Sequence, residues 1–324
     1  MRVDAVELSR LAGRTGFPEA TLDRVLRLHA LVQDIAVHPL LREVLALKGG
    51  TALNLFFGEP TRLSVDLDFN YVGSPERSVM ERDRPIVEKA VCEIGRAQGY
   101  RVQRSAEAHA GRKIYFDSQE GGTPARRVEV DLNYLHRVPL YALDARSMWH
   151  PDGAASHALP LMSLEEICAG KVCAMLDRGL PRDLFDVAGL AERASELWTG
   201  PRFRVAFLAL ACALPKPLNE YEGSVGSGAT EAAVQQQLWP MLVPAARSSA
   251  AVLVEAARRA VMPLLRLTPA EQEFHDRLHA GVLAPALLAP DDEELAGRIG
   301  RHPVLLWKAQ HARDFAARRP TKGA

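Results

Sequence analysis

Apolar residues recur at helical spacing near the start of the chain. Over 18–37 they place Leu22, Val25 and Val32 on one face, which predicts a helix packed against a core. The same spacing predicts further helices over 40–45, 85–98, 163–179, 182–190, 202–214, 238–265 with a break at Pro244, 268–281, 291–297 and 304–317.

Three consecutive segments, 101–104, 113–117 and 127–134, alternate between apolar and polar residues. Alternation is typical of strands with one face on the core, so these segments predict an antiparallel meander. In the last segment the polar face consists of Glu129, Asp131 and Asn133.

All the expected strands lie before residue 160, and only helices are expected after it. We therefore predict an α+β protein with two domains, because 324 residues can bury two cores of ordinary size. Residues 1–160 would form a mixed or antiparallel sheet with flanking helices, and residues 161–324 would form a helical bundle. No internal repeat is detected.

One short stretch combines both patterns with chemistry. A strand runs into Lys48, Gly49 and Gly50 make a turn, and Thr51 opens a helix. Two glycines permit positive φ and close backbone approach, and Thr51 is placed to cap the helix. Amide N–H groups at the positive helix end would then face an anion. Lys48 could approach the same anion or lie in solvent.

The next strand is predicted over 64–69 and carries Asp66 and Asp68. Alternation points both carboxylates to one face, with Cα atoms about 7 Å apart. Two like charges at this distance raise each other's pKa unless a cation lies between them. Oxygen ligands of this kind suit Mg²⁺ shared with nucleotide phosphates. A phosphate cradle beside a metal pair indicates phosphoryl or nucleotidyl transfer.

A second group of charged residues lies on two consecutive helices. Ser163-x-x-Glu marks the capped start of the first helix, which carries Lys171. The second carries Arg182, Asp183 and Asp186, where the two aspartates share a face and Arg182 can pair with Asp186. Lys171 could stabilise triphosphate charge. Alternatively, the whole group is an ion-pair network that ties the two helices together.

Composition and charge limit the classes of partner. Hydrophobic residues make up 48% of the chain, charged residues 25%, and the formal net charge is zero. A uniformly basic surface for nucleic acid is excluded, so RNA contact would need a local patch. The basic residues around the meander are candidates for such a patch: Arg101, Arg104, Arg112, Lys113, Arg126, Arg127 and Arg137.

Location is judged from the N-terminus and the cysteines. The N-terminal residues are too charged for a signal peptide, and no run approaches the ~20 apolar residues of a membrane span. The four cysteines show neither a Cys-x-x-Cys pair nor zinc-finger spacing to histidine, which predicts buried free thiols. We expect a cytoplasmic protein with no membrane contact.

The string Lys48-Gly-Gly-Thr-Ala-Leu53, then Arg62, then Ser64-Val-Asp-Leu-Asp-Phe69 resembles the signature of the AbiEii family of bacterial nucleotidyltransferase toxins. That family includes the mycobacterial MenT enzymes and is similar in turn to nucleotidyltransferases of the DNA polymerase β type. The resemblance is dense from residue 44 to residue 71 and recurs over 171–190, where a lysine precedes an Arg-Asp-x-x-Asp sequence.

The resemblance implies a polymerase β-like nucleotidyltransferase core and a set of roles. Asp66, Asp68 and Asp131 would hold Mg²⁺, or alternatively Mn²⁺, and Asp131 would help to deprotonate the attacking hydroxyl, with Glu129 as the alternative third carboxylate. Lys171 and Asp186 match the catalytic lysine and aspartate of the family. Gly49 to Thr51 and Lys171 would bind the triphosphate, and Asp186 would orient Lys171 or the base. The full set of nucleotide-binding candidates is Lys48, Gly49, Gly50, Thr51, Lys171, Arg182 and Asp183.

The family also implies a substrate and partners. The enzyme would transfer a nucleoside monophosphate from an NTP to the 3′ end of tRNA, block translation and serve in phage defence. A cognate antitoxin would be encoded nearby and would inhibit with or without direct contact. Within the same chemistry the acceptor could instead be a small molecule or a protein. A different class of function is a non-catalytic nucleotide-binding module.

Overall fold

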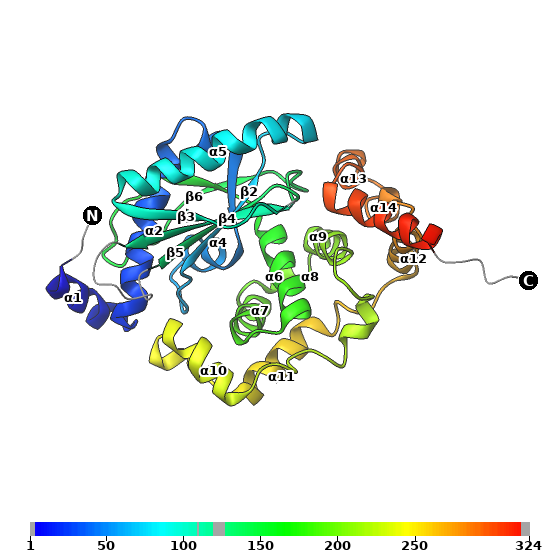
Figure 1. The fold of residues 1–324 in the computed structure, drawn as a ribbon. Helices are drawn as coiled ribbons and strands as arrows, with labels where there is room; N and C mark the ends of the chain where they lie inside the picture. The colour runs from blue at the N-terminus through cyan, green and yellow to red at the C-terminus, as the bar shows by residue number, and fades with distance from the viewer. Residues whose placement is uncertain (1–3, 109, 119–126, 319–324) are drawn as a thin grey trace, which may run out of the picture.

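A computed structural model describes residues 4–108, 110–118 and 127–318. Its seven strands form one mixed sheet in the order β3-β4-β5-β2-β1-β7-β6 (Figure 1). The strands are β1 (Leu45–Lys48), β2 (Asp66–Tyr71), β3 (Tyr100–Arg104), β4 (Gly111–Ser118), β5 (Arg127–Asn133), β6 (Asp144–Ser147) and β7 (Ala158–Leu161).

Two pairs of strands are parallel, β2 with β5 and β1 with β7, and the other neighbours are antiparallel. The predicted meander is confirmed as β3-β4-β5. Strands β6 and β7 were not predicted, because each has only four residues and too few alternations to show a period.

Helices surround this sheet and make up most of the rest of the described chain. They are α1 (Ala5–Thr15), α2 (Glu19–Val37), α3 (Leu41–Val44), α4 (Gly49–Phe56), α5 (Arg77–Ala97), α6 (Leu164–Arg178), α7 (Pro181–Arg193), α8 (Ser195–Thr199), α9 (Pro201–Ala211), α10 (Glu231–Gln237), α11 (Ala250–Val261), α12 (Pro269–His279), α13 (Glu293–Gly300) and α14 (Pro303–Arg318). The α+β fold class is therefore confirmed.

Several helices differ from the predictions, and α8 and α10 were not predicted. Helix α1 was missed, although Asp4 caps it and Gly16 ends it with φ 76°. Helix α5 begins at Arg77 rather than Pro85, because its first turns are too polar to show an apolar period. The predicted helix over 238–265 is shorter, since two short 3-10 turns that contain Pro240 and Pro244 precede α11.

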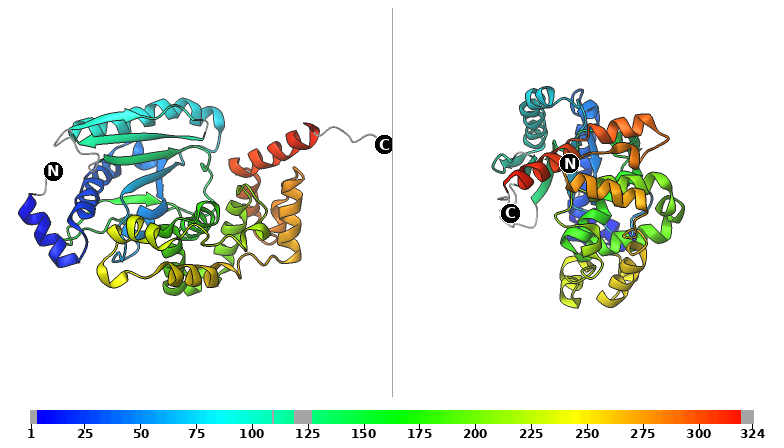
Figure 2. Two further views of the ribbon diagram at one scale, coloured as in Figure 1. Left: turned by 60° about the horizontal axis from the view of Figure 1, so that its bottom comes forward. Right: turned by 90° about the vertical axis from the view of Figure 1, so that its right-hand side faces the viewer.

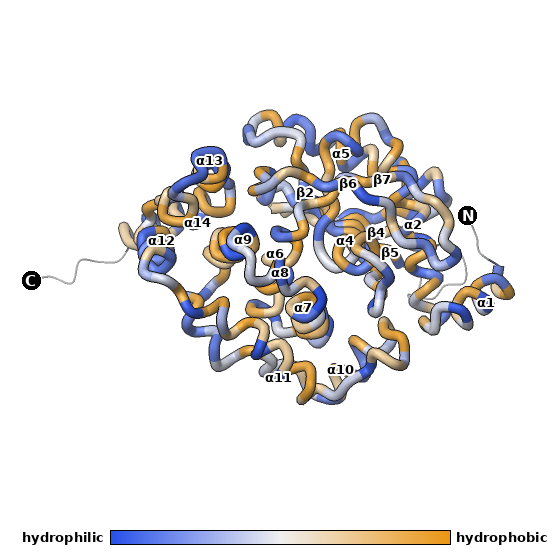
Figure 3. Tube along the Cα trace, turned by 180° about the vertical axis from the view of Figure 1, so that it is seen from behind, coloured by the Kyte–Doolittle hydropathy of each residue, from blue (hydrophilic) through white to orange (hydrophobic). Residues whose placement is uncertain are grey.

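The helices lie in groups around the sheet. Helices α1 and α2 lie at the opposite end of the molecule from α12, α13 and α14, as Figure 1 and the left view of Figure 2 show. Hydrophobic and hydrophilic segments alternate within helices such as α7 (Figure 3), which is typical of helices with one packed face. No helix of the described residues is long and apolar enough to cross a membrane.

A single hydrophobic cluster runs through both halves of the chain, from Leu11 to Ala309. It includes strand residues such as Leu67 and Phe69, which are fully buried, and residues of the later helices. A small separate cluster joins α10 to α11. The division of the chain near residue 160 stays a prediction. The sheet and the helices after it are packed together, so residues from both can meet at one site.

Candidate active site

The diglycine turn brings the backbone unusually close to β2. Gly49 has φ 74°, and a Cβ atom there would collide with Oδ2 of Asp68. A Cβ atom at Gly50 would lie 2.9 Å from Oγ of Ser64 and 3.5 Å from Nζ of Lys171. Both positions therefore require glycine, because any side chain would fill the space between the turn and these groups.

Thr51 does not cap helix α4, contrary to the prediction. The helix begins at Gly49 with Lys48 as its N-cap residue, and no side chain caps it. The hydroxyl of the fully buried Thr51 instead donates to the backbone carbonyl of Asp66. This bond ties α4 to the start of β2. The first amide N–H groups of α4 have no side-chain cap and remain available to an anion.

Three carboxylates meet on one face of the sheet. Asp66 and Asp68 lie two residues apart on β2, and Asp131 on β5 is the register partner of Asp68. Residues paired in this way have side chains on the same face. Ser64 donates a hydrogen bond of 3.0 Å to Asp66 Oδ1, which fixes that carboxylate. Glu129 is the register partner of Asp66.

The pKa values of two carboxyls in this cluster, Asp68 and Asp131, are raised. Burial raises the pKa of Asp68 to about 6, and repulsion by the Asp66 carboxylate adds to the effect. Burial also raises the pKa of Asp131, although Lys113, whose Nζ lies 3.8 Å from Asp131 Oδ2, acts in the opposite direction. The carboxylates are thus held together without enough positive charge to neutralise them.

A divalent cation fits this donor set in a limited sense. No group of three or more His, Cys, Asp or Glu side chains in the described ranges is placed to hold a metal ion. Mg²⁺ does not need such a cage, because it is usually bound by one or two carboxylates plus water and substrate phosphates. Asp66 and Asp68 can supply those two carboxylates, and a cation between them would relieve their repulsion.

Behind the turn lies a buried ion pair between Arg62 and Asp186. The guanidinium donates to both carboxylate oxygens at 2.9 and 2.7 Å, and each side chain is only 1% exposed. Asn54 donates to Asp186 at 3.3 Å and to the Gly50 carbonyl at 2.9 Å. Asp186 is therefore fixed against the backbone of the turn. Burial alone would raise its pKa, but Arg62 and Lys171 together lower it.

Lys171 joins this pair to a second one. Its Nζ lies 3.0 Å from Asp186 Oδ2 and 3.3 Å from Asp183 Oδ1, while Arg178 binds both oxygens of Asp183. Burial alone would raise the pKa of Asp183, but Arg178 and Lys171 lower it. Asp186 pairs with Arg62 and Lys171, so the predicted Arg182–Asp186 pair is wrong. The ion-pair network considered as an alternative does exist, and it lies beside the turn.

One cavity of about 490 Å³ joins the two groups of charges. Of the predicted residues it is lined by Gly50, Asp66, Asp68, Glu129, Asp131, Lys171 and Arg182. Thr51, Asp183 and Asp186 are buried, and Lys48 faces a neighbouring cavity. The carboxylates of the sheet and the lysine of α6 therefore open onto the same space.

Sequence reasoning assigned no role to four polar residues that line this cavity: Arg24, Arg62, Ser64 and Arg178. Arg178 lies seven residues after Lys171 on α6, and this two-turn spacing could have placed both on one helix face. Arg24 projects from α2 and offered no such signal.

The candidate RNA-binding arginines of the meander are largely engaged elsewhere. Arg112 pairs with Glu88, and Arg127 pairs with Asp117. Of that set only Lys113 lines the carboxylate cavity. Arg126 lies outside the described residues, and RNA contact by this set stays a prediction.

Comparisons with known proteins agree with the site. The sequence profile of "Nucleotidyl transferase AbiEii toxin, Type IV TA system" matches residues 30–246, more than half of the chain. A similar solved structure is the MenT4 nucleotidyltransferase toxin of Mycobacterium tuberculosis H37Rv, with a TM-score of 0.61 at 19% identity over 94% of this chain and 99% of that one. No curated protein matches in sequence. The chain belongs to the AbiEii family of nucleotidyltransferase toxins of type IV toxin–antitoxin systems.

Proposed function

We propose that this nucleotidyltransferase uses Mg²⁺, with Mn²⁺ as the alternative ion, to transfer a nucleoside monophosphate from an NTP to the 3′ end of tRNA. The observation that carries the proposal is the meeting of Asp66, Asp68 and Asp131 on one sheet face beside the diglycine turn. This is the donor set that phosphoryl chemistry requires, next to a backbone shaped to approach phosphate.

The triphosphate would lie along the N-terminus of α4. Its uncapped amide groups and the positive helix end favour an anion there. The ion-pair network beside it contains three cations, Arg62, Lys171 and Arg178, and two carboxylates. One positive charge is therefore left over near Gly50. Arg62 and Lys171 both lie near Gly50, with Nη2 and Nζ 3.1 and 3.5 Å from the position of a Cβ atom there. Because Arg62 is held by both oxygens of Asp186, Lys171 is the cation placed to neutralise a phosphate oxygen.

The proposed step is a displacement at the α-phosphorus. The 3′ hydroxyl oxygen of the acceptor forms a bond to that phosphorus, the bond to the bridging oxygen of the β-phosphate breaks, and pyrophosphate leaves. Asp131 would take the hydroxyl proton, because its raised pKa makes it a better proton acceptor than an ordinary surface aspartate. Asp66 and Asp68 would hold the cation, which neutralises developing charge on the phosphate oxygens.

A nucleic-acid acceptor is supported by charge at the cavity rather than over the whole surface. The chain has no net charge, but Arg24, Lys113 and Arg182 line the cavity together with the network cations. Nε of Arg24 is buried and has no hydrogen-bond partner within the described part of the chain. Guanidinium groups in such a position suit the phosphates of an acceptor strand.

The toxin activity follows from the acceptor. An extra nucleotide on the 3′ end of tRNA would block aminoacylation and stop translation, and phage defence would follow from that arrest. A type IV system includes an antitoxin partner. Inhibition by that antitoxin would occur with or without direct contact.

The test is transfer of label to tRNA by the purified protein. We expect label from α-labelled NTP but not from γ-labelled NTP, and a loss of at least about 10²-fold for Asp68→Ala with its fold retained. Transfer of γ-label would mean a kinase and would overturn the mechanism. Parallel incubations with total protein and with aminoglycosides identify a different acceptor if tRNA stays unlabelled.

Growth arrest gives a second readout of the same proposal. Expression of the wild type in a bacterium should stop growth, whereas expression of Asp66→Ala at equal level should not. Equal arrest by both proteins would favour a binding function over catalysis.

A further inference from the structure

A second cavity, of about 400 Å³, opens on the same sheet face beyond the carboxylates. In the antiparallel register Lys48 lies opposite Asp68, and Ala46 lies opposite Asn70. Asp68 and Asn70 are two residues apart on β2, so their side chains share a face. Lys48 and Asn70 both line the second cavity. The cavity therefore continues from Asp68 along β2, away from the diglycine turn.

Helix α6 borders both cavities. Lys171 and Arg178 face the carboxylate cavity, whereas Glu166, Gly170 and Asp177 face the second one. Lys48 lies between the two, since its charge acts on the carboxyls of Asp68 and Asp131 and also on His136. The two cavities are therefore neighbours along α6 and β2, with Lys48 between them.

Two buried side chains line the second cavity with unused hydrogen-bonding atoms. Asn70 is 3% exposed, and its Oδ1 has no hydrogen-bond partner in the described residues. His302 is 2% exposed, and its Nδ1 likewise has no hydrogen-bond partner there. Leaving a buried polar atom unpaired costs about 1–3 kcal/mol. Two such atoms in one cavity are typical of a site that receives its hydrogen bonds from a ligand.

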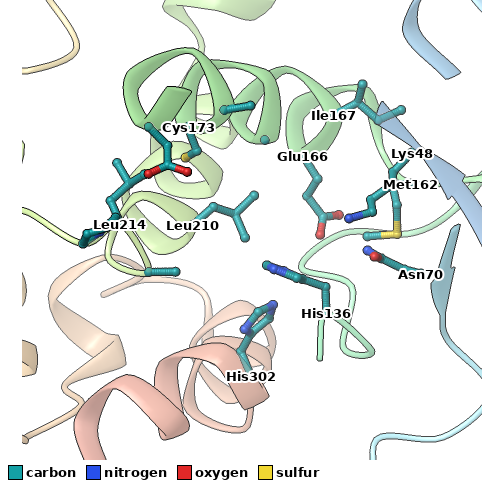
Figure 4. A pocket seen from close by; sticks show the side chains of 15 residues that line it. Lys48, Asn70, His136, Met162, Glu166, Ile167, Cys173, Leu210, Leu214 and His302 are labelled. Carbon is teal, nitrogen blue, oxygen red and sulfur yellow. The ribbon is translucent and has the colours of Figure 1, made fainter. Parts of the chain in front are cut away.

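The remaining walls suit a flat, partly polar group. Met162, Ile167 and Leu210 supply apolar surface, and the rings of His136 and His302 lie with centroids 5.5 Å apart (Figure 4). Burial and the charge of Lys48 lower the pKa of His136 well below its ordinary value, so its ring is neutral. A neutral ring and aliphatic side chains are the surroundings on which nucleobases stack.

The second cavity lies on the donor side of the carboxylates rather than the acceptor side. The strand order places β5 on one side of β2 and β1 on the other. Asp131, the proposed base for the acceptor hydroxyl, is on β5, whereas Lys48 at the cavity entrance is on β1. With phosphates on the turn, a donor ribose at Asp68 would direct its base toward Asn70, about 7 Å further along β2.

We propose that the cavity between Lys48 and His302 binds the nucleobase of the donor NTP, and that the Asn70 amide contacts the hydrogen-bonding edge of that base. The inference rests on the proposed nucleotidyl transfer and assigns the residues that would select the NTP. An amide offers a donor and an acceptor side by side, the arrangement that asparagine uses when it binds a base edge in two places.

The test compares NTPs with inorganic tripolyphosphate, which has the phosphates but no base. Asn70→Leu removes the amide, and Ala213→Trp fills the cavity from its partly exposed wall. For each we expect KM for the preferred NTP to rise at least tenfold, while the inhibition constant of tripolyphosphate changes less than twofold. Asn70→Asp exchanges a donor for an acceptor and should change the order of preference among the four NTPs.

Asn219→Leu is the matched control, because this exposed asparagine lines a different cavity and should leave all constants unchanged. If Asn70→Leu fails to fold, the KM values of Ala213→Trp test the proposal. KM values within twofold of wild type for all four NTPs would overturn the proposal. A raised KM for the acceptor instead would assign the cavity to the terminal base of the acceptor and also overturn it.

Failure of the proposed function has a separate outcome. If the wild type transfers no nucleotide to any acceptor, the proposed nucleotidyl transfer is wrong. The base subsite is then tested by the affinities of the wild type for NTPs and for tripolyphosphate. Equal affinity of the wild type for NTPs and tripolyphosphate would then overturn the base subsite.

Discussion

Two groups of charges lie on either side of Gly50, and they differ in almost every physical respect. The carboxylates of the sheet face, Asp66, Asp68 and Asp131, crowd together with little positive charge beside them, and the pKa of Asp68 is raised to about 6. The network behind the turn pairs Asp183 and Asp186 with Arg62, Lys171 and Arg178, and the pKa values of its carboxyls are lowered.

Burial does not explain the difference, because Asp183 and Asp186, which are more deeply buried than the sheet carboxylates, are the ones with lowered pKa values. What differs is the supply of cations within hydrogen-bonding distance. Both carboxylates of the network are paired within the chain, and their ion pairs hold α6, α7 and the turn in place. The sheet face is incomplete, and such repulsion persists in a folded protein where a ligand relieves it. Structural and ligand-binding charges can thus be told apart by their partners.

The largest effect is expected from breaking the network. Asp186→Ala leaves Arg62 buried at 1% exposure without its bidentate partner, and loss of one partner of a buried pair costs about 3–5 kcal/mol. Equilibrium unfolding in urea should show this loss. Asp144→Ala, which breaks the half-exposed pair with Arg146, is the matched control and should cost less than about 1 kcal/mol.

Replacing both members of the Arg62–Asp186 ion pair separates the loss of the pair from the cost of a lone buried charge. Arg62→Leu with Asp186→Leu removes the pair without leaving a lone charge, so the double variant should regain at least about 1 kcal/mol relative to the sum of the single changes. A loss below about 1 kcal/mol for Asp186→Ala would mean that the network does not stabilise the fold.

The two groups also differ in how far the sequence predicts them. The sheet face is encoded locally, because alternation over 64–69 and over 127–134 places Asp66, Asp68 and Asp131 on polar faces. The one further assumption is that β2 and β5 are neighbours in the sheet, as the structure shows them to be. Capping and periodicity are also local features, and they predict helices α6 and α7.

The network depends on contacts that no local pattern contains. Arg62 and Asp186 are 124 residues apart, and the sequence favoured a pair between Arg182 and Asp186 because they are four apart. The position of Thr51 in the chain predicts a helix cap, but its hydroxyl donates instead to the backbone carbonyl of Asp66, which tertiary packing brings close. Partners supplied by tertiary packing override those supplied by spacing.

A smaller effect, of opposite sign, is expected on the sheet face. Asp68→Asn should raise the free energy of unfolding at pH 7.5 by about 1–3 kcal/mol, because it removes a carboxylate whose pKa is near 6 in the fold and 3.8 outside it. A raised pKa means that the folded wild type gains stability as the pH falls through 6 toward 4. The difference between the two proteins should therefore be largest above pH 6 and small below pH 4.

Two controls accompany this measurement. Asp144→Asn removes a carboxyl whose pKa is lowered by Arg146, so it should be neutral or slightly destabilising. Added Mg²⁺ should stabilise the wild type and leave Asp68→Asn unchanged, because only the wild type has both carboxylates. A variant less stable than wild type at pH 7.5 without added metal ion would show that Asp68 is already compensated, and the contrast with the network would disappear.

The smallest effect concerns Lys113, the one cation that reaches the sheet carboxylates from β4. Its ammonium contacts Glu129 and lies 3.8 Å from Asp131, but all three side chains are about one-third to one-half exposed. Lys113→Met should therefore change the free energy of unfolding by less than about 1 kcal/mol. It should also lower the Mg²⁺ concentration needed for half-maximal thermal stabilisation about two- to threefold, because Asp131 loses a competing cation. The control is Lys89→Met, on an exposed turn of α5, which should leave that concentration unchanged. An unchanged concentration for Lys113→Met would show that Asp131 takes no part in binding the ion.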